Sequence, residues 1–239
     1  MTDNQAAPEV SSQWAFLMDL LSHDVLNNNQ AVLSYLELVL ANPETTPKDR
    51  EYAEKALAQL RTSTLLLENA RDMMAVRSGR TGNMQPTDLA RLSKSALKEL
   101  GKFFPGKRFK VRWAKESPAA IVMGNVLLKD LVFNAFVELA KADPGENVEI
   151  EARIVSSDKG GKPSWTLLLS DRNAVLQPGA RIDDMEYILS QDSSRMVRVS
   201  GFLFAMMGAG ILGGDFGTKD LGEGKGVELS LRLVKAGEA

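Results

Sequence analysis

The chain has 239 residues, with 31 acidic and 29 basic side chains and a formal net charge of −2. Because nucleic-acid binding through phosphates needs an excess of positive charge, this balance argues against a nucleic-acid partner. The chain has no cysteine, which excludes disulfides, thiol catalysis and thiolate zinc sites, and its single histidine argues against most transition-metal sites. No stretch approaches the ~20 apolar residues of a membrane span. The first residues also lack a signal-peptide pattern, so we expect a cytoplasmic protein without a membrane partner.

The first part of the chain predicts a long amphipathic helix. After a polar tail at residues 1–10, which we expect to be disordered, Ser11 or Ser12 can cap the helix. Asn42 and Pro43 end it. Its apolar residues recur at three- and four-residue steps and form one stripe: Trp14, Leu17, Leu21, Val25, Val32, Tyr35, Leu36 and Val39.

A second long helix follows after a short link. Thr46 is a cap residue, Pro47 suits the first helical position and Asp49 is an acid in the first turn. The pattern ends near Ser78 and Gly79. Each helix has about 30 residues, hence ~45 Å, and the short link makes them antiparallel. A second copy completing a four-helix bundle would bury the remaining apolar faces, although the rest of the chain could cover them instead.

After a linker at residues 77–83, the rhythm changes to mixed helix and strand. Helices are predicted at 87–104, 126–142 and 199–210, with a small helix at 183–189. Strands are predicted at 109–113, 148–156, 165–170 and 227–234. This order predicts an α/β sandwich with helices on one face of a mixed sheet.

His23 lies within the first predicted helix and is followed at once by Asp24. Side chains four residues apart share a helix face, so Asn27 lies one turn along from the imidazole. Asp24 can accept or orient one ring proton, which leaves the other nitrogen free to attack phosphorus. Asn27 could hold a water in line for hydrolysis of a phosphoryl group. A lone histidine on a helix is more often a surface or core residue, so these neighbours carry the prediction.

The same residues resemble the core of two-component sensor histidine kinases. Ser22 to Asn27, followed by Tyr35-Leu36-Glu37-Leu38, is similar to the family's H-box, with Ser34 in place of a glycine. Residues 85–89 are similar to the entry of its ATPase-like domain, and residues 127–135 to its N-box. The resemblance runs from Ser12 to the C-terminus. It implies a dimerisation and histidine-phosphotransfer hairpin at 11–80 and a degenerate α/β sandwich of the GHKL ATPase type at 81–239.

The resemblance also implies roles for single residues. His23 would be the phosphoacceptor, Asp24 its acid/base partner, and Asn27 the residue that helps to dephosphorylate a partner. Asn134 keeps the second N-box asparagine, whereas Asp130 replaces the first, which helps to hold magnesium in the family. Asp130 is therefore a candidate ligand for a hard cation. Asp171 keeps the aspartate that meets the adenine amine in the family.

The resemblance weakens where a nucleotide should bind. The glycines that should follow Asp171 are absent from residues 172–175, and residues 195–201 carry bulky side chains where the family has phosphate-binding glycines. Arg195 and Arg198 are better explained as solvated surface residues than as phosphate ligands. We therefore expect Asn134 and Asp171 to be remnants of a nucleotide site.

These observations predict a homodimeric histidine phosphotransfer protein of a two-component phosphorelay. It would pass phosphoryl groups between receiver-domain aspartates through His23, without ATP or another cofactor. The expected partner is the receiver domain of a response regulator, docked beside His23 against Leu20, Leu26 and Ala31. Two alternatives stay open: a divergent histidine kinase or phosphatase that still binds ATP and Mg²⁺, and a non-catalytic dimeric adaptor.

Overall fold

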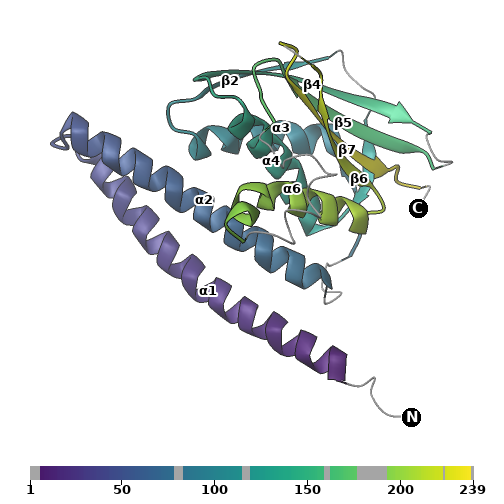
Figure 1. Cartoon of the computed structure of the whole chain (residues 1–239), viewed down its shortest axis with the longest axis horizontal. Coiled ribbons are helices and arrows are strands. Elements are labelled where there is room, and N and C mark those ends of the chain that lie inside the picture. The colour runs from purple at the N-terminus through teal and green to yellow at the C-terminus, as the bar shows by residue number, and fades with distance from the viewer. Residues whose placement is uncertain are drawn as a thin grey trace. The chain divides into compact units, whose positions relative to one another are not determined.

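A computed structural model describes residues 6–77, 83–114, 119–158, 162–176, 193–222 and 224–237. The chain divides into two compact units, Met1–Arg80 and Thr81–Ala239, which are described separately (Figure 1). Within the described ranges, no helix is both long and apolar enough to span a membrane. The predicted small helix at 183–189 and most of the predicted linker lie outside the described residues.

The first unit is a hairpin of two long helices, α1 (Ala6–Ala41) and α2 (Pro47–Arg77). The helix α1 begins at Ala6, inside the range 1–10 for which a disordered tail is predicted. Its first residues are two alanines and Pro8, and alanine favours helix while proline is tolerated in a first turn. The predicted start of α2 is confirmed, since the amide of Asp49 donates to Thr46 Oγ1 at 3.2 Å.

Polar contacts join the two helices along the hairpin. Asn29 Nδ2 donates to Thr64 Oγ1 at 3.1 Å, and Arg61 pairs with Glu37 at 3.2 Å. Near the link, Arg50 Nη1 donates at 2.8 Å to the backbone oxygen of Leu40, one of the last carbonyls of α1. These pairs, at sequence separations that shrink toward the link, fix the antiparallel register of the hairpin.

The seam of α1 is not the apolar stripe that the sequence indicates. Its more buried positions recur with the spacing of a two-helix seam, at Ser22, Leu26, Asn29, Leu33, Leu36 and Leu40. Much of the predicted stripe is exposed instead: Val25 is 39%, Val32 47%, Tyr35 69% and Val39 43% exposed. One further apolar residue, Leu38, is 66% exposed. The hairpin by itself therefore leaves an apolar face of α1 uncovered.

The second unit is a five-stranded mixed sheet covered on one face by helices (Figure 1). Only the pairing of the first two strands in sheet order is parallel. The strands in sheet order are β2 (Arg108–Trp113), β4 (Asn147–Ser157), β5 (Ser164–Asp171), β7 (Val227–Val234) and β6 (Asp215–Asp220). The helices are α3 (Leu89–Phe103), α4 (Val126–Ala142) and α6 (Ser193–Ile211). A separate antiparallel pair, β1 (Gln85–Asp88) with β3 (Ile121–Gly124), lies at the entry to the unit.

The helix α4 forms the centre of the core, with most of its residues buried. A strong apolar run explains this burial, and Asn125 caps the helix by accepting the amide of Leu127 at 3.0 Å. Glycines allow α6 to approach α4 closely, because a Cβ at Gly208 would overlap the side chain of Leu131. The strands of the sheet alternate buried and exposed residues, as one covered face requires.

The predicted α/β sandwich is confirmed, and the helix at 126–142 and the strand at 227–234 have the predicted bounds. The last helix was predicted from residue 199, but it begins at Ser193. The sequence analysis missed β1, β3 and β6. The first two have only four residues each, and β6 contains one apolar residue, Phe216, between aspartate and glycine, which disfavour strands.

Candidate functional site

His23 is exposed on the hairpin, and its two predicted partners lie against its ring. Its Nδ1 lies 3.1 Å from Asp24 Oδ1, and both side chains are solvent-accessible, at 71% and 68%. Asn27 Nδ2 lies 3.3 Å from each ring nitrogen. The structure thus brings together the three residues that the sequence predicted.

The helix orients this group outward. Ser22 lies in the seam of the hairpin and is only 1% exposed, so the next residues along the helix turn toward solvent. A neutral ring with its proton on Nδ1 donates to Asp24 and carries a lone pair on Nε2, 3.3 Å from Asn27 Nδ2. The side chain of His23 is 71% exposed, so a reactant can reach it from solvent. Of the residues predicted to flank a docked partner, Leu26 is half-buried in the seam and Ala31 is exposed.

The predicted nucleotide remnants lie in the second unit. Asn134 is fully buried on α4, and its Nδ2 donates at 2.8 Å to the backbone oxygen of Asp130, one turn earlier. The amide is therefore directed along its own helix. Asp130 is half-buried, and in the parts of the chain that the structure describes no three acidic or histidine side chains gather as a metal site would require.

Asp171 ends β5 and is 1% exposed. Its Oδ1 accepts the amide of Asn173 at 2.8 Å, while its Oδ2 has no hydrogen-bond partner among the described atoms. Burial raises the pKa of Asp171 to about 6, against the opposing effect of the Asn173 amide, and the neighbouring carboxyl of Asp143 raises it further. The sequence analysis did not single out Asp143. Its only signal is its position at the end of the long α4 pattern, before Pro144 and Gly145.

These residues suit only one end of the nucleotide that the resemblance implies. The orphaned Oδ2 of Asp171 suits an amino group of a base, although Asp143 lies beside it. The phosphate end fits poorly. Residues 195–201, which the resemblance assigns to the phosphate loop, lie inside α6. From residue 197 onward their backbone amides are bonded to carbonyls four residues earlier, so most of this stretch offers no free amides to a phosphate.

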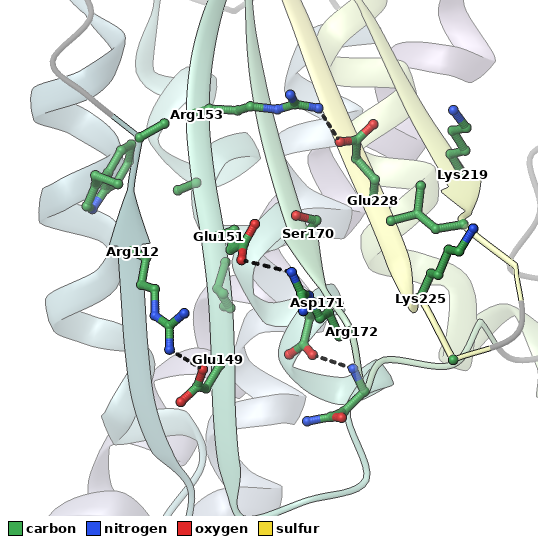
Figure 2. A pocket seen from close by; sticks show the side chains of 17 residues that line it. Arg112, Glu149, Glu151, Arg153, Ser170, Asp171, Arg172, Lys219, Lys225 and Glu228 are labelled. Carbon is green, nitrogen blue, oxygen red and sulfur yellow. Dashed lines mark hydrogen bonds and ion pairs between the residues drawn. The ribbon is translucent and has the colours of Figure 1, made fainter.

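A broad hollow of the second unit lies on the outer face of the sheet (Figure 2). It has a volume of about 890 Å³, and Asp171 is among its lining residues. Three acids of this face are each paired with an arginine: Glu149 with Arg112 at 2.8 Å, Glu228 with Arg153 at 2.8 Å and Glu151 with Arg172 at 3.8 Å. Because these charges are matched on an open surface, we assign the hollow no catalytic role.

Comparisons with known proteins place the fold. No protein-family model and no curated protein matches the chain. Full-length ShkA in complex with AMPPNP matches 92% of the chain at 18% identity and a TM-score of 0.58, and the chain spans 46% of that protein. The histidine kinase AdeS of Acinetobacter baumannii matches 88% of the chain and 97% of its own at 12% identity and a TM-score of 0.54. The cytoplasmic segment of the histidine kinase QseC matches 74% of the chain and 94% of its own at 12% identity and a TM-score of 0.51. The chain therefore has the fold of these histidine kinase structures, a two-helix hairpin followed by an α/β sandwich.

Proposed function

We propose that this chain is a two-component signalling protein that carries a phosphoryl group on His23. The observation that carries the proposal is the exposed group of His23, Asp24 and Asn27 on a hairpin of the histidine kinase fold. An exposed imidazole with a carboxylate on one nitrogen is suited to attack phosphorus with the other. The His23 side chain is 71% exposed, so a donor can approach that nitrogen from solvent.

The proposed step is a transfer between two high-energy phosphoryl compounds. Nε2 of His23 forms a bond to phosphorus while the bond from phosphorus to the donor's oxygen breaks, and the donor leaves with that electron pair. The imidazole gains positive charge in this step, and Asp24 Oδ1, 3.1 Å from Nδ1, stabilises it. Asn27, on the same face, is placed to orient a water that attacks the phosphoryl group of a docked partner, so that phosphate is released and the partner's oxygen keeps the bonding electron pair.

The first candidate for the donor is ATP, which would make the chain a divergent histidine kinase. The comparisons support this order of candidates, because AdeS and QseC are histidine kinases and match both parts of the chain together. The sequence analysis had ranked this alternative second. Asp171 would meet the base, and Mg²⁺ would lie near Asp130, whereas no residue of the phosphate end can be assigned.

The second candidate for the donor is a phosphorylated receiver domain, which would make the chain a phosphotransfer protein that needs no ATP. The helical conformation of residues 195–201 supports this candidate, because from residue 197 onward the backbone amides are bonded within the helix and are not free for a triphosphate. The exposed group of His23, Asp24 and Asn27 supports this candidate equally, because transfer from a receiver requires only that the receiver docks beside His23. Here too the receiver domain of a response regulator is the proposed partner.

The proposed assembly is a homodimer that pairs two hairpins in a four-helix bundle. Its support is the apolar face of α1 that the hairpin leaves uncovered, with Tyr35 and Leu38 the most exposed members. Burying each of these side chains contributes roughly 1.5–3 kcal/mol. Light scattering coupled to gel filtration should therefore give a dimer for the native chain and a monomer for Tyr35→Glu/Leu38→Glu. Gln30→Glu/Ser34→Glu, two polar exposed positions on the same helix, is the matched control and should stay dimeric.

One labelling experiment separates the donors. The purified chain is incubated with γ-labelled ATP and Mg²⁺ in one arm, and with labelled, phosphorylated receiver domains of the source organism in the other. Acid-labile label from ATP that His23→Gln abolishes supports the kinase, whereas label from the receiver alone supports the phosphotransfer protein. Asn27→Ala should slow loss of phosphate from a partner, and Asn28→Ala, its exposed neighbour, should not. A chain that takes no label in either arm contradicts both candidates and leaves the adaptor.

A further inference from the structure

Two carboxyl groups of the second unit are buried together. Asp143 follows the last residue of α4, Asp171 ends β5, and each is 1% exposed. Each carboxyl uses one oxygen to accept a backbone amide, from Gly145 at 2.7 Å and from Asn173 at 2.8 Å. The second oxygen, Oδ2, of each has no partner among the described residues. Two buried acceptors without a donor cost free energy unless something supplies a proton.

Asp143 is one of the groups that raise the pKa of Asp171, so the two buried carboxyls lie close enough to interact. The amide of Val175 donates at 2.9 Å to the backbone oxygen of Ala142, which ties the loop after β5 to the end of α4. Two ionised carboxylates at such a separation repel strongly in a buried setting. A single proton between them turns one Oδ2 into a donor and the other into its acceptor, which satisfies both atoms.

The charged groups around the pair do not neutralise it. Lys107 Nζ donates to the backbone oxygens of Ala140, Asp143 and Gly145, so it faces the end of the helix and not the carboxyl oxygens. The other charged side chains of the neighbouring elements are paired elsewhere or point to solvent: Arg172 with Glu151, Lys141 with Glu138, and the exposed Glu146 and Lys225. Within the described ranges, no cation contacts either Oδ2.

We propose that Asp143 and Asp171 share one proton and form a pH-sensitive latch between the end of α4 and the end of β5. Burial, followed by the effect of Asp143, raises the pKa of Asp171 to about 6, so the shared proton is lost close to neutral pH. Its loss leaves two charges facing each other and weakens the latch. The latch engages the oxygen of Asp171 that would meet a base amino group, so a base and the latch compete for it. This inference does not depend on phosphorylation of His23.

The test is a carboxyl titration by NMR on the full chain with ¹³Cγ-labelled aspartate. The native chain should show one aspartate that titrates near pH 6 and that the spectra of Asp171→Asn and Asp143→Asn identify as a member of the pair. In Asp143→Asn, which keeps the shape and can donate from its amide, the midpoint of Asp171 should fall by at least one pH unit. Asp158→Asn, at an exposed acid after β4, is the control and should leave the midpoint unchanged.

Two results would overturn the proposal. Either Asp171 of the native chain titrates near pH 4, or its raised midpoint persists in Asp143→Asn, in which case burial alone raises it and no proton is shared. Urea unfolding of the second unit gives a separate readout. The native unit should lose stability as the pH rises from 4 to 7, because the folded state holds a proton that the unfolded state has released. That slope should flatten in Asp143→Asn, and an unchanged slope counts against the latch.

Discussion

The turn before the last strand should contain one glycine that cannot be replaced and another that can. Gly226 has φ = 79° and Gly224 has φ = 69°, so alanine at either position adopts a left-handed backbone at a cost of about 1–2 kcal/mol. At Gly224 no atom lies within 4 Å of an added Cβ. At Gly226 an added Cβ would lie 2.5 Å from Arg172 Cα and 2.7 Å from its carbonyl carbon, and would overlap the carbonyl oxygen of Asp171. These atoms are backbone and cannot turn away.

Relief of that overlap requires the last residue of β5 to move away from the first residue of β7. Asp171 and Val227 are the last pair of these strands, and Val227 is 1% exposed. Opening the pair loses about one hydrogen bond, worth about 1 kcal/mol. Partial exposure of Val227 costs up to about 1.5–3 kcal/mol more. Gly226→Ala should therefore destabilise the second unit by about 3–5 kcal/mol, and Gly224→Ala by the backbone cost alone.

Tryptophan fluorescence during urea unfolding can measure this difference in the intact chain. The three tryptophans are Trp14 in the first unit and Trp113 and Trp165 in the second, so a Trp14→Phe background reports on the second unit alone. The two alanine variants are compared at pH 7 with equal m-values as the test of a shared unfolding reaction. Equal losses of stability in both variants, within about 0.5 kcal/mol, would refute the reasoning from backbone contact.

Three further outcomes follow from single contacts in the second unit and use the same unfolding assay. Asp88→Ala removes the cap whose Oδ1 accepts the amides of Ala90 and Arg91, and should cost about 1 kcal/mol, most of which Asp88→Asn restores. Lys107→Met removes the ammonium that binds three carbonyls at the end of α4 and should cost about 2 kcal/mol. The control is Lys102→Met, which removes an exposed pair with Glu99 and should leave the stability nearly unchanged. Asp171, with its pKa raised from 3.8 to about 6, should make the native unit up to about 3 kcal/mol less stable at pH 7 than at pH 4, and Asp171→Asn should remove that difference.

The sequence predicted most of the second unit because its helices and central strands have strong apolar periods. The helix at 126–142 and the strand at 227–234 are long and mostly buried, so pattern and structure agree to the residue. The edge strand β6 escaped prediction because pairing with β7, and not its own composition, holds Asp215–Asp220 extended. The early start of α6 escaped for a related reason. The resemblance favoured a loop there, whereas the residues themselves lack the glycines that a loop of that kind needs.

In the candidate site too, contacts within one helix could be predicted and contacts between distant segments could not. His23, Asp24 and Asn27 could be predicted together because their geometry depends only on spacing within one helix, which the sequence states directly. Asp143 could not, because its relation to Asp171 depends on where the end of a helix meets the end of a strand, 28 residues apart in the numbering. Long-range pairs of this kind leave no periodic signal in a single sequence.

The exposure of His23 and the burial of Asp171 suggest a further way to identify the phosphoryl donor. His23 is open to solvent, so a donor can reach it whether it is carried by this chain or by another protein. Asp143 and Asp171 are almost completely buried and interact with each other, so under the proposed latch a nucleotide base competes with Asp143 for Asp171. If ATP is the donor, Asp143→Ala should strengthen nucleotide binding by removing that competitor, and calorimetry with ATP and Mg²⁺ can measure the change. If a receiver is the donor, the same variant should leave label transfer to His23 unaltered, because the hairpin holds every group that this transfer uses.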